Sequence, residues 1–98
     1  MIVVRNIFQL KFGKAKDAIA LIKENQELMK KYSHTTSRFL TDVTGDFYTL
    51  EMETTYENLT AFEKSSKEMM AVKEFGLWYE KFVPLVESGR REIFSLME

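Results

Sequence analysis

The polar side chain with the clearest chemical potential is Asn6. It interrupts a segment in which every second residue is apolar, and it shares one side of that segment with Val4 and Phe8. A buried amide costs free energy unless it finds hydrogen-bond partners. Asn6 is therefore a candidate for orienting a bound molecule. The alternative is that it bonds a neighbouring side chain or backbone group.

Two aromatic residues with polar tips share faces with apolar residues. Tyr48 lies two residues before Leu50, so both belong to the same face of the predicted strand. Trp78 lies four residues before Phe82, so both belong to the same face of the predicted helix. Ligand pockets are mostly apolar, with a few polar groups that fix the orientation of the ligand. We therefore predict that Asn6, Tyr48 and Trp78 converge on a cleft for a small apolar or aromatic molecule. The alternative is that both rings are core residues whose tips reach water.

Two further residues are secondary candidates. His34, the single histidine, lies in a connecting segment, where a histidine is usually a solvated surface group. Arg38 lies on a short strand whose register depends on the turn that follows. A two-residue turn at Thr44-Gly45 places Arg38 opposite Glu51, on the face away from the helices. One extra residue in the turn exchanges the faces and places Arg38 beside Leu50. A structural ion pair is the expected role.

Other kinds of site are excluded by composition. The chain has no cysteine, so disulfides, thiol nucleophiles and thiolate metal sites are excluded, and one histidine cannot supply a metal-binding pair. No two carboxylates are isolated in an apolar segment, as a general acid–base pair would be. We expect neither a metal nor a cofactor. The formal net charge is −1 with both signs interleaved, which argues against nucleic acid as a partner.

The N-terminal segment bears on location. It alternates apolar with polar residues and includes Arg5, whereas a signal peptide needs an uninterrupted apolar core. No segment approaches the roughly 20 apolar residues of a membrane-spanning helix. We expect no membrane partner and a cytoplasmic location.

The first half of the chain predicts a strand, a helix and a hairpin. Residues 2–11 are rich in β-branched and aromatic residues and end at Gly13, which predicts a strand. Residues 14–32 change to the i, i+3, i+4 spacing of an amphipathic helix. Two short strands follow, at 37–43 and 46–53. Gly45 can adopt the positive φ of a tight hairpin turn between them.

The second half predicts a helix and a last strand. Thr54 and Glu57 have the spacing of a capping box that opens the helix, and a break or kink is expected at Gly76. Pro84 ends the helix, a turn follows at 88–89, and the last strand covers 91–97. The order is βαββαβ. It predicts one α+β, ferredoxin-like domain over residues 1–98, with a four-stranded antiparallel sheet, both helices on one face, and the first and third strands central.

One face of this sheet remains uncovered by the helices. It is predicted to bear Val3, Ile7 and Phe47 among charged residues such as Arg5 and Glu51. Burying each apolar side chain contributes roughly 1.5–3 kcal/mol. A second copy laid face to face would bury them and pair the charges, so we predict a homodimer through the sheet faces. A solvated sheet face is the alternative.

Several segments resemble a known superfamily over essentially the whole chain. They are the opening strand leading into KFGK, the arginine-bearing RFLTDVTG, the aromatic DFYTLEME, the helical FGLWYEKF and the closing SGRREIF. Together they resemble the dimeric α/β-barrel superfamily, specifically NIPSNAP-like proteins, and more distantly the antibiotic-biosynthesis monooxygenases. The resemblance implies two ferredoxin-like subunits that pack their sheets into one barrel.

The resemblance implies less about activity, because NIPSNAP-like domains share no defined chemistry. Some monooxygenases of the superfamily use a strand-one asparagine with a tryptophan and a histidine from the second helix, and need no metal. Asn6 and Trp78 match that pattern, but His34 lies elsewhere. We therefore expect an uncharacterised NIPSNAP-like protein that binds a small molecule. The alternatives are a cofactor-independent monooxygenase and a non-catalytic interaction or assembly module.

Overall fold

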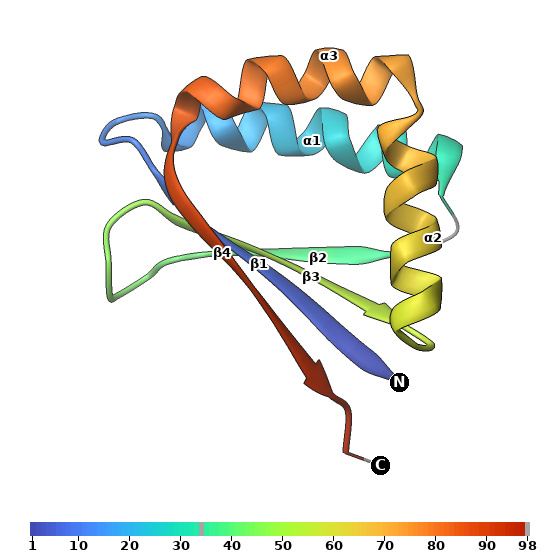
Figure 1. Ribbon diagram of the computed structural model, residues 1–98. Coiled ribbons are helices and arrows are strands. Elements are labelled where there is room, and N and C mark those ends of the chain that lie inside the picture. The colour runs from blue at the N-terminus through green and yellow to red at the C-terminus, as the bar shows by residue number, and fades with distance from the viewer. Residues whose placement is uncertain (34, 98) are drawn as a thin grey trace.

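The computed structural model describes residues 1–33 and 35–97, which form one α+β domain (Figure 1). The elements follow in the order β1 (Ile2–Leu10), α1 (Ala15–Tyr32), β2 (Ser37–Thr41), β3 (Thr49–Tyr56), α2 (Leu59–Met70), α3 (Lys73–Phe82), the short 3₁₀ helix η1 (Val83–Leu85) and β4 (Val86–Ser95). The predicted ferredoxin-like class is confirmed, with the second helix divided into two.

The four strands form one antiparallel sheet in the order β2-β3-β1-β4, so β1 and β3 are central as predicted. Asn6 lies opposite Met52 of β3 and Arg91 of β4. Because directly opposed residues of an antiparallel pair share a face, these three side chains belong to the helix side of the sheet.

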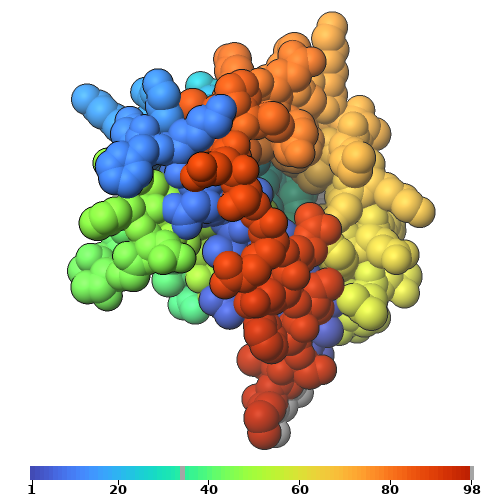
Figure 2. Space-filling view, turned by 60° about the vertical axis from the view of Figure 1, so that its left-hand side comes forward, coloured from blue at the N-terminus to red at the C-terminus, as the bar shows by residue number. Residues whose placement is uncertain are grey.

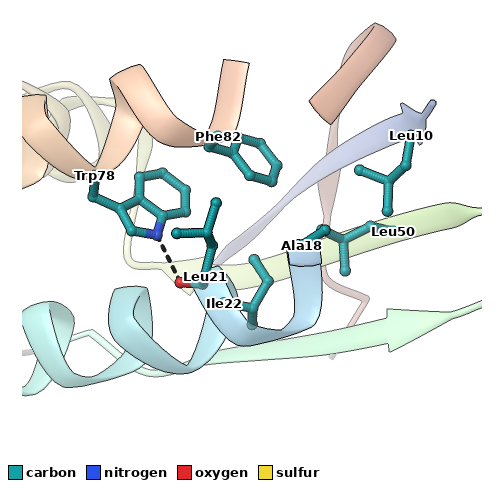
Figure 3. Close-up of a cluster of buried hydrophobic side chains, with 7 residues drawn as sticks. All are labelled: Leu10, Ala18, Leu21, Ile22, Leu50, Trp78 and Phe82. Atoms are coloured by element: carbon teal, nitrogen blue, oxygen red, sulfur yellow. Dashed lines mark hydrogen bonds between the residues drawn. The ribbon is translucent and has the colours of Figure 1, made fainter. Parts of the chain in front are cut away.

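Helices α1 and α3 lie side by side over one face of the sheet, and α2 turns towards the sheet at one end of them (Figure 1). Between the layers lies a core of side chains that are at most 9% exposed: Leu10, Ala18, Leu21, Ile22, Leu50, Trp78 and Phe82 (Figure 3). The periodicity of the sequence predicts this contact, since the apolar stripe of each helix faces the apolar side of β1 and β3.

The second helix breaks at a different place from the predicted one. The chain leaves helical geometry at Val72, whose φ of −81° and ψ of 120° are extended, whereas Gly76 lies inside α3. The predicted capping box is also wrong, because β3 continues to Tyr56. Asn58 instead caps α2 by accepting a hydrogen bond from the backbone N–H of Ala61 at 2.9 Å.

The hairpin between β2 and β3 has a longer loop than the predicted turn. Residues 42–48 connect the strands, and Gly45 adopts a positive φ of 107° within them. The Asp42 carboxylate anchors the loop by accepting from the backbone N–H of Thr49 at 2.8 Å. Phe47 consequently belongs to this loop and is 69% exposed, so its predicted place on the sheet face is wrong.

The last strand begins earlier than predicted. The expected turn at 88–89 lies inside β4, where Gly89 is opposite Phe8. A Cβ atom on Gly89 would lie 3.2 Å from Cδ1 of Phe8, so the glycine permits close packing rather than a turn. Figure 2 shows the far end of β4 projecting beyond the body of the molecule. Among the described residues, none of the helices combines the length and apolarity that crossing a bilayer requires.

Candidate functional site

A cleft opens between the helix face of the sheet and the helices. Its volume is about 440 Å³, and residues from β1, β3, β4, α1, α2 and α3 line it. Figure 2 shows its mouth between β4 in red, α2 in yellow and α3 in orange, with α1 visible in teal at its floor. At Val72 the chain leaves helical geometry, so α2 and α3 run in different directions, and both helices contribute residues to the walls of the cleft (Figure 1).

The walls of the cleft are mainly methionine and aromatic side chains. They are Met29, Met52, Tyr56, Phe62, Met69, Met70, Phe75 and Tyr79. Methionine is flexible and polarisable, and it adapts to apolar groups of different shape. Such walls favour an apolar or aromatic ligand, but they do not select one particular ligand shape.

Asn6 lies on the cleft wall, as its position in β1 predicts. Its side chain is half-buried, and its Oδ1 atom accepts a hydrogen bond from Nε of Arg91 at 2.7 Å. The guanidinium of Arg91 also lies 5.2 Å from the centre of the Phe62 ring. A cation over an aromatic face and a charge-assisted hydrogen bond both hold this arginine beside the cleft.

Asn25 is the second amide of the cleft. It belongs to α1, is 3% exposed, and its Oδ1 atom has no hydrogen-bond partner among the described residues. A buried acceptor without a partner costs about 1–3 kcal/mol. The signal was present in the sequence, because Asn25 occupies a core position of the apolar stripe that includes Leu21 and Ile22, as Asn6 does in its strand. Arg91 was missed because the predicted last strand begins at that residue, and the sequence alone did not predict that it lies opposite Asn6.

Trp78 lies in the core and does not line the cleft. It is 7% exposed, and its indole N–H donates to the backbone oxygen of Leu21 at 2.6 Å (Figure 3). Its ring stacks on Phe82 at a centroid distance of 4.9 Å and on Phe75, which does line the cleft, at 5.6 Å. The structure therefore places Trp78 in the core, which is the alternative role, and not among the residues that line the cleft.

Tyr48 is also displaced from its predicted position. It is the last loop residue before β3, with a φ of 60°, and its ring meets the exposed Phe12 ring edge to face at 4.7 Å. It does not line the cleft. Of the three predicted residues, the structure therefore brings only Asn6 to the cleft, and it adds Asn25 and Arg91.

The two secondary candidates have different outcomes. His34 lies outside the described residues. Arg38 lies opposite Glu53, two positions from the predicted Glu51 because the loop is longer, and it pairs with the Glu53 carboxylate at 2.8 Å. The slip is an even number of residues, so Arg38 keeps the face away from the helices and has the predicted structural ion pair.

That open face holds a charge network centred on Arg5. Its guanidinium lies 2.7 Å from Glu51, 3.3 Å from Glu92 and 3.6 Å from Glu53. The hydrogen bond from Arg5 lowers the pKa of Glu51 to about 2, and the same bond raises the pKa of Arg5. Both shifts favour the charged forms of Arg5 and Glu51, which suits an ion pair better than proton transfer.

A second hollow, of about 750 Å³, lies on the same open face. Strand residues such as Ile7 and Arg90 line it together with the 42–48 loop. Nothing in the described part of the chain groups three metal-binding side chains together. The two charged strand residues of this hollow, Glu51 and Arg90, are already held in ion pairs, and we regard the cleft on the helix side as the candidate ligand site.

Comparison with known proteins identifies the fold. No protein-family model matches the chain, and no curated protein matches it. An uncharacterised NIPSNAP-domain protein from Burkholderia xenovorans has the same fold with a TM-score of 0.90 and 13% identity, over 99% of this chain and 95% of that one. A NIPSNAP family protein from Agrobacterium tumefaciens str. C58 has a TM-score of 0.88 and 14% sequence identity, over 99% of this chain and 93% of that one.

Monooxygenase-like structures are similar to a lesser degree. A putative antibiotic biosynthesis monooxygenase from Nitrosomonas europaea has a TM-score of 0.78 and 11% identity, over 100% of both chains. The resemblance to NIPSNAP-like proteins, and more distantly to these monooxygenases, is confirmed at the level of the fold. At such identities the likeness extends to the fold alone, so function has to be argued from the cleft.

Proposed function

We propose that this NIPSNAP-like protein binds a small apolar or aromatic metabolite in the cleft between the sheet and the helices. A volume of about 440 Å³ lies within the usual range for ligand pockets, about 300–1,000 Å³. Walls of methionine and aromatic side chains with a few polar groups also fit such a pocket.

The observation that supports this function best is the buried Oδ1 atom of Asn25. A core asparagine without a partner destabilises the free protein, whereas leucine at the same position would pack without that cost. Asn25 lines the cleft, so a ligand that displaces its immediate neighbours and donates a hydrogen bond to Oδ1 would satisfy the acceptor.

Gly76 gives a second reason to expect a ligand. It lies in the interior of α3 and lines the cleft, and a Cβ atom there would meet nothing within 4 Å. A glycine inside a helix costs roughly 0.5–1 kcal/mol relative to alanine. None of the described residues comes close enough to require a glycine there, so Gly76 keeps that side of the cleft open.

The proposal includes a homodimer formed through the open sheet faces. Each face bears three arginines and three glutamates, interleaved with apolar side chains: Arg5, Arg38, Arg90, Glu51, Glu53 and Glu92, beside Val3, Ile7, Leu40 and Phe94. A two-fold interface must be self-complementary, and a face with balanced charges meets that requirement. We also propose a cytoplasmic location, which cell fractionation would test.

A cofactor-independent monooxygenase is the second candidate. Asn6 lining the cleft favours it, and solved structures described as antibiotic biosynthesis monooxygenases share the fold. Trp78 does not line the cleft, which favours binding over this chemistry. A non-catalytic assembly module would need no cleft. Oxygen consumption with electron-rich phenols would distinguish the enzyme from the binder.

The neutral fluorophore N-phenyl-1-naphthylamine tests the binding function. We expect its fluorescence to rise on mixing with the protein and Gly76→Phe to weaken its binding at least tenfold, because the new ring would occupy the cleft. Gly76→Ala is the matched control and should bind normally. Equal binding by Gly76→Phe, or no fluorescence increase with the native chain, would refute the proposal.

A further inference from the structure

The four arginines of the chain differ in their partners. Arg5, Arg38 and Arg90 form ion pairs with glutamates on the open face of the sheet. Arg91 forms no ion pair with a carboxylate of the described residues, and its Nε donates to Oδ1 of Asn6 instead. Arginine is charged at every physiological pH. Arg91 therefore presents an uncompensated positive charge at the cleft.

The guanidinium of Arg91 is held in place before any ligand arrives. Its Nε atom donates to Oδ1 of Asn6 at 2.7 Å, and its Cζ atom lies 5.2 Å from the centre of the Phe62 ring. The two terminal nitrogens, Nη1 and Nη2, have no acceptor among the described residues. Paired N–H groups of a fixed guanidinium match the two oxygens of a carboxylate.

The other cleft residues carry no charge that could neutralise Arg91. No aspartate, glutamate or lysine of the described residues lines the cleft, and its walls are mainly apolar. We propose that Arg91 binds the carboxylate of the ligand, which is an apolar or aromatic monocarboxylic acid. This inference rests on the proposed binding function and specifies the class of molecule bound.

Asn25 adds a second requirement on the same ligand. Its Oδ1 atom can only accept and has no partner among the described residues, so a ligand hydroxyl or N–H group that reaches it would satisfy it. Asn25 belongs to α1 and Arg91 to β4, which are different walls of the cleft. The ligand therefore carries a hydrogen-bond donor on its apolar body, apart from its carboxylate.

Two naphthalene compounds test this class. 6-Hydroxy-2-naphthoic acid has the ring, the hydroxyl and the carboxylate, and 2-naphthol lacks the carboxylate. We expect the native protein to bind the acid at least tenfold more tightly than the naphthol, as measured by calorimetry. Arg91→Gln should abolish this preference because the affinity for the acid falls much more than the affinity for 2-naphthol, and Arg91→Lys should retain part of it.

Arg90→Gln is the matched control, because it removes the same charge one residue away on the other face. It should retain the preference for the acid. Equal affinity of the native protein for both compounds, or an equal loss of preference in Arg90→Gln and Arg91→Gln, would overturn the inference. In both of these outcomes 2-naphthol would still bind, so the proposed binding function would stand. If neither compound binds and N-phenyl-1-naphthylamine also fails, the binding function itself is wrong.

Discussion

Arg90 and Arg91 are consecutive in β4, yet their side chains belong to opposite faces of the sheet. Arg90 is opposite Ile7 in the register and pairs with Glu92, whereas Arg91 is opposite Asn6 and bonds to its amide. Side chains alternate along a strand, so this separation follows from the backbone alone. The open face and the cleft can therefore be altered independently, with neighbouring residues as mutual controls.

The first prediction concerns the open face. We expect sedimentation to give twice the chain mass of 11.5 kDa at micromolar concentration. Phe94→Glu should give monomers, because Phe94 is 50% exposed on that face and a new carboxylate there would be desolvated in the dimer. Leu77→Glu, at 51% exposure on α3, is the control and should remain dimeric. A monomeric native chain would contradict the prediction.

The second prediction concerns pH. Glu51 has its pKa lowered to about 2 by the hydrogen bond from Arg5, so it binds fewer protons in the folded state than in the unfolded state. Its contribution, on the order of 1–2 kcal/mol after screening, is complete above the unfolded pKa near 4.5 and is lost as the pH falls through about 2.

Urea unfolding of the native chain and Glu51→Gln, at one protein concentration and several pH values, measures this contribution. The difference in unfolding free energy should be largest near pH 6 and should vanish towards pH 2. A difference that stays constant with pH would show that the Arg5–Glu51 pair is not its source.

The third prediction compares two glycines. Gly76→Ala should raise the unfolding free energy by roughly 0.5–1 kcal/mol, because α3 gains helix propensity and the new Cβ meets nothing within 4 Å. Gly89→Ala should lower it, since its Cβ would lie 3.2 Å from Phe8. Denaturant midpoints measure both effects. Destabilisation by Gly76→Ala would remove the argument that the glycine leaves space for a ligand.

The fold was predictable because its strongest signals are local. The change from period 2 in residues 2–11 to helical spacing in residues 14–32 gives the element types, and their order leaves few topologies. The loop at 42–48 was not predictable in the same way. Asp42 anchors it through the N–H of Thr49, and several turn types are compatible with the same Thr-Gly sequence.

The site was less predictable, because it depends on where the second helix breaks. The break at Val72 sets the directions of α2 and α3, which both line the cleft, and the extended backbone there has no glycine or proline to mark it. Asn6 was recognised because it breaks an apolar alternation. The same reasoning applied to the stripe of α1 would have identified Asn25. The position of Trp78 follows from its hydrogen bond to Leu21, a contact 57 residues apart in the chain.

The last prediction tests whether Asn25 is retained for a ligand. Asn25→Leu replaces a buried acceptor that has no partner among the described residues with an apolar group of similar size. We expect the unfolding free energy to rise by about 1–2 kcal/mol, because the cost of desolvating the amide disappears. We also expect weaker binding of 6-hydroxy-2-naphthoic acid, since its hydroxyl loses its acceptor. Residues that lower stability while improving binding are characteristic of functional sites.

Denaturant unfolding and calorimetry of the same variant measure the two effects together. Asn25→Ala is the control for size: it also removes the acceptor, but it leaves a void, so its gain in stability should be smaller while its loss of binding is similar. A structural role for Asn25 predicts the opposite pattern, with Asn25→Leu less stable than the native chain and binding unchanged. Because stability and affinity should move in opposite directions, a mutation that merely disturbs the fold cannot produce the expected result.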